Sequence, residues 1–205
     1  METHSILSLT EGFEDTESFL ILKAFLFAEK MHRGQKRYDG TPYIVHPVAV
    51  ARILVLELGI RDAELVCTSL LHDVLEDTPT TREDLERVFG KIITSLVEGV
   101  TKPEYLLPEE ETTIPLVQKK HEARERYALQ LAEHPDPRVL LLKLCDALDN
   151  MRTLHCCEQT KRLRTQEKTR RYYLPLLNVL EREHTHLQEE TNHLKRELFF
   201  ALGIR

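Results

Sequence analysis

The sequence predicts an all-α fold that forms one helical domain. Apolar residues recur at helical spacing in nearly every segment, and residues typical of helix starts and stops separate these segments. No run of useful length alternates apolar and polar residues as a half-buried strand does. The 205 residues, 41% of them hydrophobic, suffice for one well-buried core, so residues 1–205 are expected to form a single domain.

Helix boundaries follow one another closely in the first half of the chain. Pro47 suits the first turn of a helix, and Gly59 ends that helix just after Leu58. Asp62 can cap the next helix, which is expected to continue through His72 to Glu76. The capping-box pattern Thr80-Thr81-Arg82-Glu83 opens a short helix that Gly90 closes. Two further helices are expected over residues 17–31 and 91–100.

The second half contains one long loop and several helices. Residues 103–115 hold three prolines and four glutamates without periodicity, which predicts a surface loop. Helical patterning returns over 116–133, and a Pro-rich break at 134–137 precedes a strongly apolar helix that begins near Arg138. Two more helices follow, the last over 184–202. One face of this last helix carries a narrow seam of Leu187, Thr191, Leu194 and Leu198. The seam is expected to pack in the core, with a homodimer contact as the alternative.

Composition limits the classes of partner and the compartment. The net charge of −6 argues against a broad nucleic-acid-binding surface, so phosphate recognition is expected only in a pocket. No signal-peptide pattern is present near the N-terminus, and the apolar stretch 19–27 is too short to span a membrane. A cytoplasmic protein without a membrane partner is expected. Four cysteines are expected to be buried or incidental reduced thiols, with a zinc or disulfide role as the alternative: Cys67, Cys145, Cys156 and Cys157.

The segment from His72 to Asp77 concentrates ionisable side chains. On a continuous helix, His72 and Glu76 nearly eclipse, and Asp73 and Asp77 extend the same face. Four such groups repel one another or require desolvation unless a positive charge lies among them. The alternative is a solvated acidic helix end, but the preceding residues 65–71 are apolar enough to direct this end into the protein.

Two other segments carry polar residues in informative positions. His46 directly precedes Pro47, where its ring can project from a helix start. Asp146, Asn150 and Thr153 are spaced at i, i+4 and i+7 on a helix that is otherwise rich in leucine. Such a polar stripe is either a satisfied buried network or the lining of a site.

Together these residues compose a sensible metal site. His46, His72, Asp73 and Asp146 offer two imidazoles and two carboxylates, which suits manganese, iron or zinc better than calcium. Four protein ligands leave positions for water and for a phosphate oxygen on a metal that accepts six. Glu76 and Asp77 lie one turn beyond two of the ligands, where they can orient or deprotonate that water.

The sequence resembles the hydrolase domain of RelA/SpoT proteins over about residues 20–180. The runs that carry the resemblance are His32 to Arg37, Gly40 to Pro47, Leu70 to Thr78, Val97 to Lys102 and Lys143 to Thr153. The resemblance implies an all-α, single HD-type domain of the small alarmone hydrolase kind. It implies one Mn²⁺ per chain and cleavage of the 3′-diphosphate from guanosine penta- and tetraphosphate, with release of pyrophosphate.

The resemblance also assigns roles to individual residues. His46, His72, Asp73 and Asp146 match the metal ligands of the family, and Glu76 and Asp77 match the pair that assists the attacking water. Substrate-binding positions match at Arg37, Lys102, Asn150 and Thr153. Of these, Arg37 is expected to stack on the base, and Asn150 and Thr153 to contact the ribose and the 5′-phosphate side. Lys102 matches a basic residue that closes the first half of the domain.

The chain departs from the family pattern beside the nucleotide. The family usually has Arg-Lys-Ser where this chain has Arg37-Tyr38-Asp39, and Asp-Arg-Leu-His-Asn where it has Asp146 to Asn150. A cation is thus absent at Tyr38 and at Ala147, and Asp149 replaces a histidine. None of these changes affects the metal set, but they leave base identity and 5′-phosphate number open. Asp39 or Asp149 could accept hydrogen bonds from guanine.

Four alternatives to guanosine alarmone hydrolysis stay open at this point. Adenosine alarmones come second as substrates, and phosphatase activity on a dinucleotide such as NADPH comes third. A catalytically silent alarmone sensor is a rival, although it has no need of the Glu76-Asp77 pair. A purely structural helical adaptor has no need of His46, Asp73 and Asp146 together.

Overall fold

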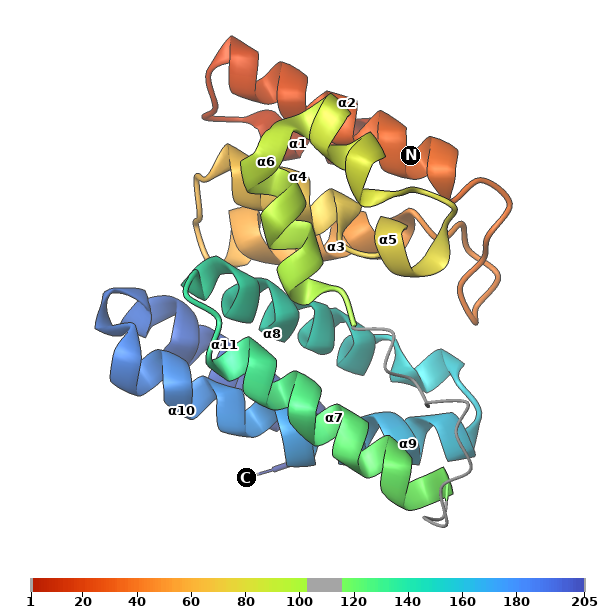
Figure 1. Ribbon diagram of the computed structural model, residues 1–205, viewed down its shortest axis with the longest axis vertical. Coiled ribbons are helices and arrows are strands. Elements are labelled where there is room, and N and C mark those ends of the chain that lie inside the picture. Colours follow the sequence, from red (N-terminus) through yellow and green to blue (C-terminus); the bar gives the residue numbers. More distant parts are fainter. Residues whose placement is uncertain (1, 103–115, 205) are drawn as a thin grey trace.

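The computed structural model describes residues 2–102 and 116–204 and confirms the all-α fold. Within these residues the only pairing of β type is an isolated bridge between Lys36 and Pro42. Figure 1 shows the helices in two groups: α1 to α6, within residues 2–100, lie above, and α7 to α11, within residues 116–201, lie below. Within the lower group, α8 (Pro137–Arg152) borders the upper one. None of the described helices is long and apolar enough to cross a membrane.

The upper group contains the helices of the first half of the chain. Asp62 caps α4 by accepting the backbone N–H of Leu65. Gly90 has a φ of 79°, which interrupts α6 where the sequence predicts a helix end. The elements are α1 (Glu2–Thr10), α2 (Asp15–Met31), α3 (Val45–Arg52), the π-helix η1 (Ile53–Glu57), α4 (Ala63–Leu71), α5 (Val74–Asp77) and α6 (Arg82–Val100).

The lower group contains the helices of the second half. Asp136 caps α8, and Pro137 occupies its first turn, as the Pro-rich break predicts. The elements are α7 (Leu116–Ala132), α8 (Pro137–Arg152), the 3-10 helix η2 (Leu154–Cys156), α9 (Gln159–Lys168), the π-helix η3 (Thr169–Tyr173), α10 (Leu174–Glu183), the 3-10 helix η4 (Thr185–Leu187) and α11 (Gln188–Ala201).

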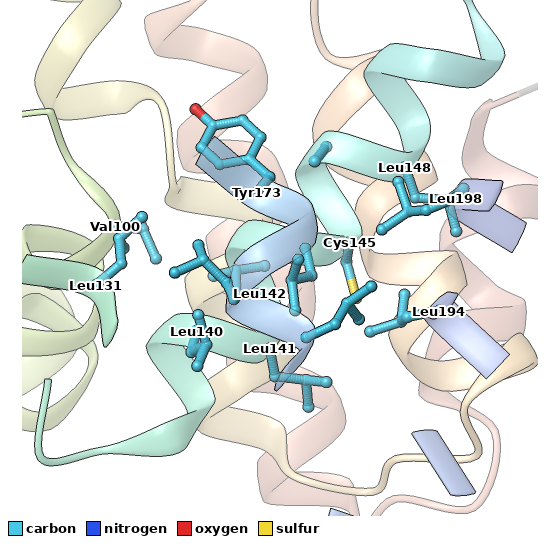
Figure 2. Packing of buried hydrophobic residues seen from close by; sticks show 14 of the residues in the cluster. Val100, Leu131, Leu140, Leu141, Leu142, Cys145, Leu148, Tyr173, Leu194 and Leu198 are labelled. Atoms are coloured by element: carbon cyan, nitrogen blue, oxygen red, sulfur yellow. The ribbon is translucent and has the colours of Figure 1, made fainter. Parts of the chain in front are cut away.

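The helix α8 lies at the centre of the molecule and packs against α3, α6, α10 and α11. Twelve of its sixteen residues are buried. Figure 2 shows Leu194 and Leu198 of α11 directed at the face of α8 that carries Cys145 and Leu148. Thr191 of the predicted seam is also buried, so the expectation that this seam packs in the core is confirmed.

Two predicted helix boundaries are wrong. The helix expected to run through His72 to Glu76 ends at Leu71, and a separate short helix begins at Val74. The capping box is shifted by one residue, because Thr81 caps α6 and exchanges hydrogen bonds with Asp84. Thr80 instead binds the hydroxyl of Thr78. The loop predicted over 103–115 lies outside the described residues.

Candidate metal and nucleotide site

Three helix ends and one helix centre bring the predicted metal ligands together. His46 lies in the first turn of α3, and His72 directly follows α4. Asp73 precedes α5, while Asp146 comes from the buried centre of α8. Adjacent residues of an uninterrupted helix point about 100° apart, so His72 and Asp73 would face different directions if α4 continued. The turn after Leu71 lets both side chains face the same cluster.

One ligand atom from each of His46, His72 and Asp146 lies within 4.8 Å of the other two. Nε2 of His46 is 3.2 Å from Oδ1 of Asp146, and Nε2 of His72 is 3.9 Å from the same oxygen. All three residues are buried. Two imidazoles and a carboxylate at this spacing form a metal site, and they match three of the four predicted ligands.

The predicted fourth ligand, Asp73, lies beside this group. Its Oδ2 is 3.1 Å from Nε2 of His72 and 3.7 Å from Nε2 of His46. The same oxygen accepts a hydrogen bond from the phenol of Tyr43 at 2.7 Å. Burial acts to raise the pKa of Asp73, but the charge and hydrogen bond of His72 together with the charge of His46 hold this pKa far below its ordinary value.

Both histidines present the ring nitrogen that a metal requires. Nδ1 of His72 donates to the backbone carbonyl of Ser69 at 2.8 Å, and Nδ1 of His46 donates to Oδ2 of Asp149 at 2.6 Å. Each Nε2 therefore points into the cluster. Nε2 of His72 is buried and makes no hydrogen bond, which fits a metal ligand better than a core histidine.

Positively charged groups balance the carboxylates of the cluster. Lys143 is 4% exposed, and its ammonium lies 2.8 Å from Oδ2 of Asp146. Burial opposes the charged form of Lys143, but the charge of Asp146 together with other nearby groups raises its pKa well above the ordinary value. Burial likewise lowers the pKa of His46, yet hydrogen bonds with Asp146 and Asp149 raise it to about 9.

The predicted catalytic carboxylates each have a defined partner. Oδ2 of Asp77 accepts from the Tyr43 phenol at 3.0 Å, so one hydroxyl joins Asp77 to the ligand Asp73. Glu76 accepts the backbone N–H of Lys102 at 2.7 Å and also pairs with its ammonium. Burial lowers the pKa of Lys102, but the Glu76 charge contributes to a net increase.

A cavity of about 220 Å³ adjoins the cluster and shares His46 with it. Three of the four predicted substrate-binding residues line this cavity. Arg37 donates hydrogen bonds to Oδ1 of Asn150 at 3.3 Å and to Oγ1 of Thr153 at 3.1 Å. Asn150 in turn donates to Asp146, which connects the cavity wall to the metal cluster. Lys102 is the exception, since it does not line the cavity and lies against Glu76.

The two acids considered for guanine recognition have other partners. Asp39 accepts from the backbone N–H and the hydroxyl of Thr41, both within its own loop. Asp149 accepts from His46. At the outer wall of the cavity, the ammonium of Lys161 lies 3.6 Å from the ring centre of Tyr38. Lys161 thus supplies a cation close to the position where the family's lysine is absent.

Sequence reasoning missed two residues that organise the site. Tyr43 lies within the run that carries the family resemblance, but nothing in its local pattern indicates a shared contact with two acids. Lys143 had a usable signal, because it is the one cation between Arg138 and Arg152 of an apolar helix and lies three residues before a proposed ligand. At that spacing the two side chains are neighbours on one helix face.

Residues 24–181 match the HD domain family. This chain belongs to the HD domain family. It is 44% identical over 161 residues to the guanosine-3′,5′-bis(diphosphate) 3′-pyrophosphohydrolase of Aquifex aeolicus (strain VF5), covering 78% of this chain and 21% of that protein. It is 42% identical over 169 residues to the bifunctional (p)ppGpp synthase/hydrolase SpoT of Escherichia coli (strain K12), covering 82% and 23%.

The HD domain thus spans about a fifth of the length of these curated relatives. A solved structure of a metazoan SpoT orthologue that hydrolyses ppGpp is similar over nearly its whole length. Its TM-score is 0.69 at 27% identity, and the match covers 90% of this chain and 94% of that one. The expected resemblance to the RelA/SpoT hydrolase domain is confirmed.

Proposed function

We propose that this HD domain removes the 3′-diphosphate from guanosine alarmones and releases pyrophosphate. The observation that carries the proposal is the shared position of His46, which belongs both to the buried metal cluster and to the wall of the adjoining cavity. A nucleotide in the cavity can thereby extend its 3′ side to a metal. The described activities of the similar proteins support the same reaction.

The proposed metal ligands are His46, His72, Asp73 and Asp146, and the proposed ion is one Mn²⁺ per chain. Their mixture of nitrogen and oxygen donors suits manganese, and the orphaned Nε2 of His72 supports the fit. A divalent ion supplies Lewis-acid polarisation of a phosphoryl oxygen when it is bound there. Asp73 is included because its Oδ2 lies within 3.7 Å of both histidines.

Glu76 and Asp77 are proposed to position the attacking water and to accept its proton. Their hydrogen bonds support these roles, because the contacts from Lys102 and Tyr43 hold each carboxylate in one orientation. The lysine also places a positive charge beside Glu76, where it can meet the negative charge of the leaving diphosphate.

Arg37, Asn150 and Thr153 are proposed to hold the nucleoside. Their mutual hydrogen bonds arrange them before any substrate arrives, which reduces the ordering cost of binding. The planar guanidinium of Arg37 can stack on a purine, and Asn150 and Thr153 offer polar atoms to the ribose.

Adenosine alarmones are the second candidate substrates. Stacking on Arg37 discriminates poorly between purines, so a preference for guanine needs a hydrogen-bond acceptor at the base edge. Asp39 and Asp149 are the acids considered for that task, and both already accept hydrogen bonds from protein groups. This observation favours a pocket that accepts either base.

A substrate panel tests the proposal. Purified protein with Mn²⁺ is incubated with guanosine and adenosine 3′-diphosphates and with NADPH, and the products are separated chromatographically. We expect GDP or GTP together with pyrophosphate from the guanosine alarmones, and none from an Asp146→Asn control. Orthophosphate from NADPH as the only product would contradict the proposal, as would binding without turnover. The cytoplasmic location and the homodimer stay predictions.

A further inference from the structure

Asp149 forms the closest side-chain contact of the proposed ligand His46. The two residues are 103 positions apart in the sequence, yet Oδ2 of Asp149 lies 2.6 Å from Nδ1 of His46. Both residues are buried, at 6% and 3% exposure. A buried carboxylate is costly unless it is paired, so the contact must contribute to the stability of this region.

The other neighbour of Asp149 is a weaker partner. Nη2 of Arg37 lies 3.9 Å from the same oxygen, which is beyond hydrogen-bond distance. Arg37 directs this nitrogen at Asn150 and Thr153 instead. The carboxylate of Asp149 therefore depends mainly on His46, and His46 on Asp149.

The hydrogen bond determines which nitrogen of His46 is available. A neutral imidazole carries one proton, and a carboxylate at Nδ1 keeps that proton there. Nε2, which is directed at Asp146 and Asp73, is then the nitrogen that gives up its proton when an ion binds. His72 is held in the same way by the carbonyl of Ser69, but a carboxylate also makes the ring a stronger donor to a cation.

We propose that Asp149 is a positioning residue that holds His46 in the orientation and tautomer needed for metal binding. The inference deepens the proposed function, since it rests on the proposed metal site, but it does not depend on which nucleotide is hydrolysed. The pattern usual in the two-domain RelA/SpoT proteins has a histidine at this position, which offers no carboxylate to His46. Asp149 then acts through His46 and does not recognise the base.

Mn²⁺ affinity tests the proposal without any nucleotide. Full-length protein is stripped with a chelator and titrated with Mn²⁺ by calorimetry, as wild type, Asp149→Ala and Asp149→Asn. We expect the alanine variant to bind about 10–100-fold more weakly, the usual effect of removing a group that orients a metal ligand. Asparagine keeps an acceptor oxygen but loses the charge, so a smaller loss of about threefold to tenfold is expected.

Glu57→Ala is the matched control, because it removes a carboxylate from a histidine, His193, that is not a proposed ligand, and it is expected to leave Mn²⁺ affinity unchanged. Circular dichroism in the presence of chelator shows whether each variant folds. If the alanine variant does not fold, the asparagine variant decides the question. Wild-type affinity in the folded Asp149 variants would overturn the proposal, as would an equal loss in Glu57→Ala. Failure of the substrate panel with normal Mn²⁺ binding would instead refute the proposed nucleotide and leave this role intact.

Discussion

The phenol of Tyr43 donates a hydrogen bond to Asp77 at 3.0 Å. Its hydroxyl also lies 2.7 Å from Asp73, so a proposed metal ligand and a proposed catalytic acid share one donor. Burial and the charge of Asp73 raise the pKa of Tyr43 far above its ordinary value, which keeps this donor protonated. The orientation of Asp77 therefore depends on a residue that carries no proposed chemistry of its own.

Tyr43→Phe is expected to lower kcat by about 10–100-fold, with a much smaller change in KM, because orientation is lost while the cavity is kept. Steady-state kinetics with a guanosine alarmone measures both constants. The matched control is Tyr172→Phe, which removes a phenol that contacts His121 outside the site. Equal losses of activity in the two variants would mean that Tyr43 contributes only to folding.

Glu76→Gln is expected to keep metal and nucleotide binding but to lose turnover by roughly 10²–10⁴-fold, the usual span for a positioned acid–base group. Glutamine can still accept the backbone N–H of Lys102, so the local structure should persist. Single-turnover kinetics and Mn²⁺ titration measure the two effects separately. Glu86→Gln, which removes a surface ion pair with Arg82, serves as the control. Loss of metal binding in Glu76→Gln would reassign Glu76 as a ligand or a scaffold residue.

The proposed metal ligands could be predicted from the sequence because their residue types and local spacing indicate a metal site. His46, His72 and Asp146 each stood at a helix end or on a polar stripe. The break after Leu71 could not be predicted, because no Gly or Pro marks it and the local pattern favours a continuous helix.

Asp39 and Asp149 were both considered as guanine acceptors because of their place beside the nucleotide in the family pattern. Asp39 binds Thr41 in its own loop, a local contact that a turn pattern can indicate. Asp149 binds a residue 103 positions away, and such a hydrogen bond leaves no periodic trace in a sequence.

Asp39→Ala and Asp149→Ala are therefore expected to change kcat/KM equally for guanosine and adenosine alarmones. A lost carboxylate contact to guanine would cost about 1–3 kcal/mol with that base and little with adenine. Paired kinetics on both substrates measures the difference directly. A loss confined to the guanosine substrate would restore the acid concerned as a base-recognising residue.

Asp136 is expected to make stability depend on acid pH. Hydrogen bonds from Arg138 lower the pKa of Asp136 below its ordinary value. Its contribution is therefore fully present above the unfolded pKa of about 4 and is lost as pH falls through the lower folded pKa. Asp136→Asn keeps the cap of α8 but removes the charge. Thermal melts should show the wild type more stable at pH 7, by at most about 1 kcal/mol because the pair is partly exposed, and the difference should shrink as pH falls below the unfolded pKa. A difference that is constant with pH would contradict this assignment.

Metal removal is expected to lower the melting temperature, because the cluster exists only in the folded chain. A ligand present at about 100 times its Kd stabilises a protein by about 2.7 kcal/mol. For a chain of this length that corresponds to a rise of roughly 5–10 °C in Tm. Protein stripped with chelator should thus gain this increment when Mn²⁺ is restored. His46→Ala should show no such rise in Tm, because it lacks a proposed ligand. His193→Ala should show the full rise, because His193 pairs with Glu57 and is not a proposed ligand. An equal rise in His46→Ala would place the stabilising ion elsewhere on the chain.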